Sequence, residues 1–232
     1  MKFKLYENFG QRTKYPSRVY PIHQVWKAAW THAAFRVQVL VTIPALLVVL
    51  TLFSHFLEWV EVRSGVVLSD PIVVMVDAHD FTWSIFIFIY AGVVIGLVTL
   101  SAHPVQLIVT VQSYIVMVSI RVVAMYVTPL DPPTGIIPLA DPFVQFFGTG
   151  AVPTKDLFFS GHTATLFLLS LTANGRWLKA LFAFCAVAVA ILIVWQHVHY
   201  VVDVLVAPFV AYTSYRLVVL FQDRVNPSWR LS

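Results

Sequence analysis

The chain contains a series of uncharged apolar runs, each long enough to cross a lipid bilayer as a helix. About 20 apolar residues are needed to span the hydrocarbon core, and residues 37–57 and 81–100 each form such a run without a formal charge. The composition agrees, because 59% of the 232 residues are hydrophobic and 11% are charged, whereas soluble domains carry about 25% charged residues. A soluble globular domain and a disordered chain are therefore excluded.

We predict an all-α polytopic membrane protein with six transmembrane helices. The predicted spans are residues 37–57, 81–100, 104–127, 157–173, 180–195 and 200–221. Pro44 and Pro208 lie inside the first and last of them and are expected to kink these helices. One transmembrane domain over residues 37–221 is then followed by a short tail, residues 222–232.

Residues 1–36 form an N-terminal arm that is polar, aromatic and basic. We expect no cleavable signal peptide in this arm, because it has no short apolar core. It contains Tyr15, Tyr20, Trp26 and Trp30, which are typical of a segment that lies along the membrane interface. Cys185 is the only cysteine, so disulfides and cysteine-based metal sites are excluded.

The cations are unevenly distributed between the two ends of the predicted bundle. With six spans, both termini and the second and fourth loops share one side. That side carries Lys2, Lys4, Arg12, Lys14, Arg18, Lys27, Arg36, Arg176, Lys179, Arg216, Arg224 and Arg230. These are 12 of the 15 cations, against only Glu7 and Asp223 among the 11 acids. The positive-inside rule predicts that both termini are cytoplasmic, and it explains the net charge without a nucleic-acid partner.

His199 and Asp203 lie near the exoplasmic end of the sixth predicted span. Ionisable residues at membrane depth are costly unless they are paired or hydrated, so they indicate a functional site. The two residues are four apart, which places them on one face of a helix and within reach of each other. A carboxylate beside an imidazole fixes its tautomer and raises its basicity, as in sites that prepare a nucleophile. The alternative is a pair that only satisfies two polar groups between helices.

A second histidine, His162, follows Ser160 and Gly161 at the start of the fourth predicted span. Glycine lets the backbone approach a ligand, and free N–H groups near a helix N-terminus can hold an anion. His162 would then supply or remove a proton. The alternative is a helix start that is capped by Ser160, with His162 reaching the interface.

Arg121 lies near the exoplasmic end of the third predicted span. Its guanidinium fork suits a phosphate group, so we interpret it as an anion clamp. The alternative is an ion pair with Asp131 or Asp141.

The other polar residues on this side are interpreted without a catalytic role. His197 is two residues from His199 and faces another way on a helix, so it is expected to be a surface or supporting residue. A solvated loop is expected to hold Glu58, Glu61, Asp77 and Asp80. Asp70 is the exception, because it is a candidate contact for a cationic headgroup.

Two segments resemble the sphingomyelin synthase branch of the phosphatidic-acid-phosphatase type 2 (PAP2) superfamily. They are Asp156-Leu157-Phe158-Phe159-Ser160-Gly161-His162-Thr163 and His199-Tyr200-Val201-Val202-Asp203-Val204. Residues 121–130 resemble the arginine-led motif of that branch, and residues 67–71, which include Asp70, resemble its first exoplasmic loop motif. The superfamily's phosphatases carry a Lys-x6-Arg-Pro motif, which this chain lacks, and an arginine where it has Ile193. Both absences favour the synthase branch.

The resemblance implies a PAP2-like helical bundle and catalysis through a phosphohistidine. His199 would attack the phosphorus of a phospholipid headgroup, and Asp203 would orient His199. His162 would protonate the departing lipid alkoxide and then deprotonate the incoming hydroxyl. The implied donor is a phospholipid such as phosphatidylcholine, the implied acceptor is ceramide, and diacylglycerol leaves.

The candidate phosphate- or substrate-binding residues are Arg121, Ser160, Gly161, Lys155, Asp156 and Tyr200. Lys155 stands where the synthases tend to have a small residue, and it would add a cation.

We expect no metal or cofactor, because fixed cations and backbone N–H groups can hold the phosphate. The expected partners are the lipid substrates and the bilayer; the headgroup, the acceptor, the oligomeric state and the choice between a bacterial plasma membrane and an endomembrane stay open.

Two rival functions also stay open. The same residues could give the phosphohistidine to water, as in a lipid phosphate phosphatase or a phospholipase C-like hydrolase. A transporter or proton-coupled channel is the second rival, in which intramembrane histidine and aspartate form a relay. It is disfavoured because the polar residues cluster at one membrane face, whereas such sites lie near the midplane.

Overall fold

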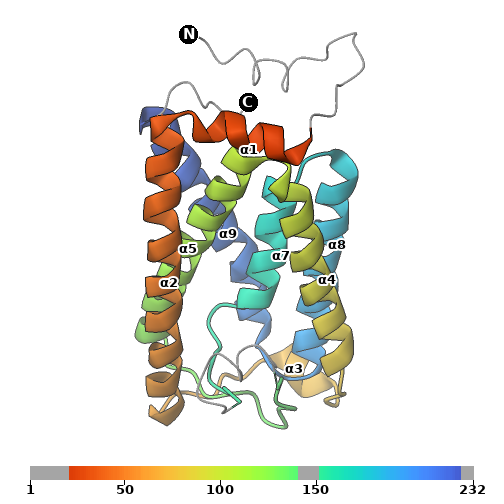
Figure 1. Cartoon of the computed structure of the whole chain (residues 1–232). Coiled ribbons are helices and arrows are strands. Elements are labelled where there is room, and N and C mark those ends of the chain that lie inside the picture. Colours follow the sequence, from red (N-terminus) through yellow and green to blue (C-terminus); the bar gives the residue numbers. More distant parts are fainter. Residues whose placement is uncertain (1–20, 141–151, 226–232) are drawn as a thin grey trace.

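The computed structural model describes residues 21–140 and 152–225, and all regular structure within them is helical. The helices are α1 (Ile22–Trp30), α2 (Ala33–Val62), α3 (Pro71–Met75), α4 (Thr82–Ser101), α5 (Pro104–Val127), α7 (Gly161–Thr172), α8 (Arg176–Trp195) and α9 (Val201–Val225). A bundle is formed by α2, α4, α5, α7, α8 and α9, with α1 across one end and α3 at the other (Figure 1). Tyr15, Tyr20 and Asp141 lie outside the described residues.

Five of the predicted spans are confirmed as helices long and apolar enough to cross a membrane. They correspond to α2, α4, α5, α8 and α9, which are 30, 20, 24, 20 and 25 residues long. At about 1.5 Å per residue, each reaches the roughly 30 Å thickness of the hydrocarbon core. Pro44 and Pro208 lie inside α2 and α9, which continue past both prolines.

The span predicted over residues 157–173 differs from the structure. The helix here is α7, which begins only at Gly161 and has 12 residues, so its length is about 18 Å. The segment before it is not helical, and its Leu157 and Phe159 are almost completely buried. Irregular backbone is tolerated at membrane depth only where protein surrounds it. Hydropathy alone predicts a helix for residues 157–160, because this segment is as apolar as a helix that spans the membrane.

The short helix α7 lies at the centre of the bundle, where it packs against α4, α5, α8 and α9. Its contact with α4 depends on two glycines, Gly92 and Gly96, spaced four residues apart. A Cβ atom built on Gly92 would lie 2.5 Å from Leu166 Cδ2, and one on Gly96 would lie 2.8 Å from Leu169 Cδ2. Small residues at this spacing let two membrane helices approach closely.

Helix α2 lies at the edge of the bundle and is attached partly through side-chain amides. Gln38 of α2 and Gln222 of α9 exchange two hydrogen bonds, of 2.6 and 3.0 Å. Gln222 also donates to Gln112 of α5 at 2.6 Å, and Gln112 donates to Thr42 of α2 at 2.9 Å. Such bonds contribute about 0.6–2 kcal/mol each between membrane helices. The network therefore ties α2, α5 and α9 together near the end where α9 terminates.

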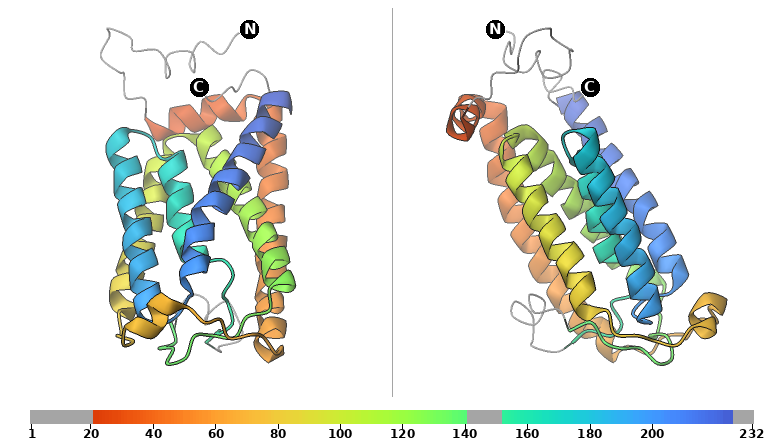
Figure 2. Two further views of the ribbon diagram at one scale, coloured as in Figure 1. Left: turned by 180° about the vertical axis from the view of Figure 1, so that it is seen from behind. Right: turned by 90° about the vertical axis from the view of Figure 1, so that its right-hand side faces the viewer.

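The bundle has two distinct ends. Helix α1 and the C-terminal end of α9 lie at one end, while α3 and the longer connecting loops, residues 63–81 and 128–140, lie at the other (Figures 1 and 2). We call the second the loop end. Trp59, Trp83 and Trp195 are exposed near the loop end of their helices, and Trp177 is exposed near the opposite end of α8. Tryptophan at both ends is typical of membrane-spanning bundles.

We expect Gly92→Leu to lower the free energy of unfolding in detergent micelles by about 1–3 kcal/mol, because the new side chain overlaps the buried Leu166. Ala91→Leu is the matched control, because Ala91 is exposed on the same helix. Equal stability of the two variants, measured by thermal or denaturant unfolding, would contradict close packing of α4 on α7.

Candidate active site

The contact predicted between His199 and Asp203 is confirmed. His199 Nδ1 lies 3.1 Å from Asp203 Oδ2, and the two residues are 2% and 0% exposed. An ionised carboxylate only accepts hydrogen bonds, so opposite an ionised Asp203 the N–H of Nδ1 is the donor. In a neutral imidazole this arrangement leaves the lone pair on Nε2.

The helical geometry predicted for this pair is wrong, although the contact is right. His199 precedes α9, which begins at Val201, and Asp203 is the third residue of the helix. The Asp203 carboxylate also accepts a hydrogen bond from the backbone N–H of Tyr200, at 3.1 Å. An acidic side chain that reaches back to the residue before a helix is half of a capping box, and it stabilises the helix start. Asp203 therefore caps α9 and orients His199 with the same oxygen.

The segment with Ser160, Gly161 and His162 is attached directly to this pair. The backbone N–H of Ser160 donates to the carbonyl oxygen of Asp203, at 3.2 Å. Ser160 is the N-cap of α7, and its side chain accepts from the N–H of Thr163. His162 is thus in the first turn of α7, beside the start of α9. Two segments that are far apart in the sequence therefore meet at Asp203.

Arg121 of α5 lies against the start of α7. A Cβ atom on Gly161 would lie 2.1 Å from Arg121 Nη1, so the guanidinium occupies the place that a side chain at 161 would take. Arg121 is 8% exposed, and it pairs with Asp156 through Nη2 at 2.9 Å. The partner is Asp156 and not Asp131. The Nε of Arg121 is buried and has no hydrogen-bond partner among the described residues.

Among the described residues, Lys155 contacts Asp131 and Arg63 rather than Arg121. Its Nζ pairs with Asp131 Oδ1 at 2.8 Å and donates to the Arg63 carbonyl at 2.7 Å. The hydrogen bond from Lys155 holds the pKa of the Asp131 carboxyl below its usual range. The stabilisation from this pair is present above the ordinary carboxyl pKa near pH 4 and is lost as the pH falls. Lys155 therefore holds two loops together, which leaves its predicted role at the phosphate without support.

Glu61 and Asp70 have structural roles that the sequence did not predict. Glu61 accepts from the backbone N–H groups of Thr154 and Lys155, at 3.0 and 3.1 Å, and so fixes the chain just before Asp156. Asp70 caps α3 with Oδ1, while its Oδ2 accepts from the N–H of Val201 at 2.8 Å. Both carboxylates satisfy backbone N–H groups. Asp70 therefore braces the start of α9, and its predicted contact with a headgroup has no support.

Tyr200 and His197 connect the loops around the site. The Tyr200 hydroxyl donates to the Asp131 carbonyl at 2.8 Å and accepts from the N–H of Leu68 at 3.1 Å. His197 was expected to be a surface or supporting residue. It is 7% exposed, with its ring nitrogens 3.0 Å from the carbonyl oxygens of Thr134 and Val76, which fits the supporting role. Both side chains are engaged with backbone groups, so they support the site rather than line it.

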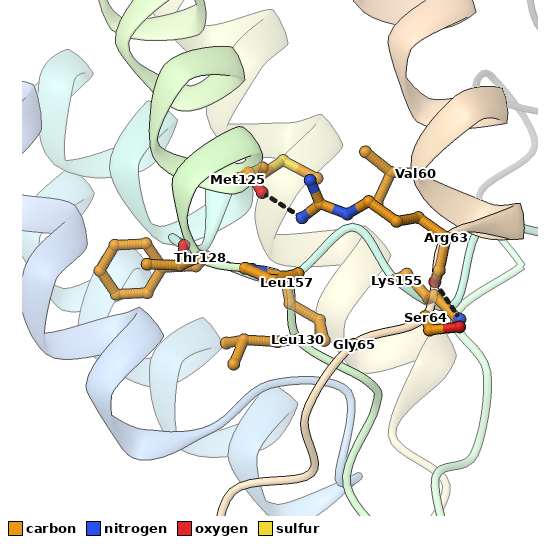
Figure 3. A pocket seen from close by; sticks show the side chains of 11 residues that line it. Val60, Arg63, Ser64, Gly65, Met125, Thr128, Leu130, Lys155 and Leu157 are labelled. Carbon is orange, nitrogen blue, oxygen red and sulfur yellow. Dashed lines mark hydrogen bonds between the residues drawn. The ribbon is translucent and has the colours of Figure 1, made fainter.

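Figure 3 shows a small pocket beside these loops, where Arg63 reaches the end of α5. Arg63 donates to the carbonyl oxygens of Met125 and Tyr126, both at 2.9 Å. A cation at the C-terminal end of a helix satisfies its last carbonyls and its dipole. The pocket has a volume of only about 10 Å³, which corresponds to about one water molecule. It is too small for a lipid headgroup.

Comparison with known proteins covers the part of the chain that holds the two histidines. Residues 155–220 match the family model described as PAP2 superfamily C-terminal. No curated protein and no solved structure matches the chain. The matched region contains His162, His199 and Asp203 but not Arg121. This match supports membership of the PAP2 superfamily, and it does not distinguish the branches within it.

Proposed function

We propose that this protein transfers a phospho-headgroup, such as phosphocholine or phosphoethanolamine, from a phospholipid to ceramide or a similar lipid alcohol. The observation that carries the proposal is the buried contact between His199 and Asp203, to which the His162 segment is tied through Ser160. The PAP2 match over both histidines supports a lipid phosphatase or phosphotransferase activity in general. The choice of transfer over hydrolysis rests on the resemblance of the two histidine segments to sphingomyelin synthases.

In the first half-reaction, the Nε2 lone pair of His199 attacks the phosphorus of the donor. A P–N bond forms and the P–O bond to diacylglycerol breaks, so the leaving alkoxide takes up the bonding electrons. His162 gives this alkoxide a proton. The Asp203 carboxylate keeps Nδ1 protonated and stabilises the positive charge that develops on the His199 ring. The product is diacylglycerol and a His199 residue that carries the phospho-headgroup.

In the second half-reaction, the hydroxyl of the acceptor attacks the same phosphorus. His162, now neutral, takes the hydroxyl proton as a new P–O bond forms. The P–N bond breaks and its electrons return to Nε2 of His199. The phosphoceramide leaves, and both histidines regain their starting protonation states.

Arg121 provides positive charge for the phosphate oxygens in this scheme. Its fork is held against Gly161, next to His162, and its Nε has no partner among the described residues. The ion pair with Asp156 fixes the guanidinium in place, and the face of Phe53 lies 5.5 Å from Cζ. Preorganised cations of this kind stabilise charge in a phosphoryl-transfer transition state without reorganisation at the moment of reaction.

The site is on the exoplasmic face in this proposal, because most cations among the described residues lie toward the opposite end, namely Lys27, Arg36, Arg176, Lys179, Arg216 and Arg224. In intact cells, a membrane-impermeant maleimide should label Asp77→Cys, at the loop end. Lys179→Cys, in the first turn of α8 at the opposite end, should react only after permeabilisation. Both positions are exposed, and the native Cys185 is buried. The reverse labelling pattern would contradict the proposed orientation.

The proposal is tested by products. Purified protein in mixed micelles is supplied with a fluorescent ceramide and a panel of phospholipid donors, and the products are separated by mass. We expect a phosphoceramide that carries the headgroup of one donor, together with diacylglycerol. In His199→Ala, turnover should fall by more than about a thousandfold, because the nucleophile is lost.

His79→Ala is the matched control, since His79 is exposed in a loop at the same end. It should keep wild-type activity. Release of phosphate or phosphocholine without phosphoceramide would favour a hydrolase that uses the same residues. Full activity in His199→Ala would contradict the mechanism, and no reaction with any donor would favour a non-enzymatic role.

We expect Gly161→Ala to reduce kcat/KM for the phospholipid donor by about tenfold to a hundredfold, because the methyl group displaces the Arg121 guanidinium. Arg121→Lys should have a similar effect, since an ammonium cannot replace the fork. Ser119→Ala, at an exposed position of α5 two residues before Arg121, serves as the control. Unchanged kinetics in both variants, with folding verified by thermal unfolding, would remove Arg121 from the site.

A further inference from the structure

An apolar groove runs between α8 and α9 and is floored by α7. Its volume is about 690 Å³, within the range of about 300–1,000 Å³ that holds small-molecule ligands. Of the described residues that line it, only Thr163 and Trp195 have a side chain that forms hydrogen bonds. The groove therefore suits hydrocarbon and does not suit a charged headgroup.

The groove exists because consecutive helices are held apart. Helix α7 packs against both α8 and α9, while these two make few contacts with each other. The side of α8 that faces the groove carries alanines at positions 183, 186 and 190, whose short side chains leave space between the helices. The lining on α8 extends from Ala183 to Trp195, which is a length of about 18 Å along the helix. Because both helices are membrane spans, the groove faces the hydrocarbon core.

The lining of the groove includes residues that are neighbours, along the chain, of the candidate catalytic residues. Thr163, which follows His162 in α7, lies at its floor. Val201 and Val204, on either side of Asp203 in the first turns of α9, form part of its wall. A lipid with its phosphate at His199 thus has a hydrocarbon path that begins within one or two residues of all three proposed catalytic side chains.

We infer that the groove binds one acyl chain of the phospholipid donor. This inference rests on the proposed function, since it takes the phosphate at His199 as the other end of the same molecule. The chain lies along Ala190 and Ala186 toward Ala183, and its length decides how much of the groove is filled. The enzyme therefore selects its donor partly by chain length, while the headgroup is bound at the loop end.

The first test compares donors that share a headgroup but carry palmitoyl or hexanoyl chains. We expect Ala190→Phe to lower kcat/KM for the palmitoyl donor by about tenfold relative to the hexanoyl donor, because about two methylene groups lose their apolar surroundings. Ala188→Phe is the matched control, since Ala188 is on the same helix but does not line the groove. Equal effects on both donors would overturn the inference and leave phosphotransfer intact.

The second test needs no groove variant and no turnover. A phospholipid with a photoreactive diazirine in the middle of one acyl chain is crosslinked to the His199→Ala protein in vesicles, and the labelled peptides are identified by mass. We expect label concentrated in residues 183–195 and 201–209. Equal label on all lipid-exposed helices, α2 included, would mean ordinary bilayer contact and would overturn the inference. Label in the groove, together with a wild-type protein that turns over no donor in the product assay, would contradict the proposed function while the lipid site remains.

Discussion

The candidate site depends on Asp203. This residue is fully buried, and three of its hydrogen bonds join two separate parts of the chain. Its carboxylate accepts from His199 and from the N–H of Tyr200, and its carbonyl accepts from the N–H of Ser160. One residue therefore starts α9, sets the tautomer of His199 and fixes the start of α7. A substitution here would disturb the helix cap as well as the imidazole, so activity and stability are coupled at this position.

The short length of α7 explains how a polar site is accommodated in an apolar bundle. A helix that crossed the whole membrane would present its N-terminus and His162 at the surface. Because α7 has only 12 residues, its first turn lies inside the bundle, and the chain before it is surrounded by protein. Arg121 then pairs with Asp156, and His199 pairs with Asp203. These contacts avoid the cost of isolated charges at membrane depth. The same short helix keeps α8 and α9 apart and so leaves room for hydrocarbon beside the site.

Much of this arrangement could be predicted from the sequence. Five spans followed from the lengths of apolar runs, and the contact between His199 and Asp203 followed from their spacing. The nonhelical stretch before α7 could not be predicted, because Leu157 and Phe159 are as apolar as residues of a membrane helix. The roles of Glu61 and Asp70 were also missed, since their carboxylates bind backbone N–H groups of segments more than 90 and 130 residues away. No local pattern encodes such partners.

The measurement that tests the central claim most directly is the detection of the phosphohistidine itself. Wild-type protein is mixed with a donor in the absence of an acceptor alcohol, quenched in alkali within milliseconds to seconds, digested and examined by mass. The account predicts a peptide that contains His199 and carries the headgroup phosphate, and this adduct should disappear when ceramide is added. Product formation with no adduct, or an adduct on His162 instead, would contradict the account.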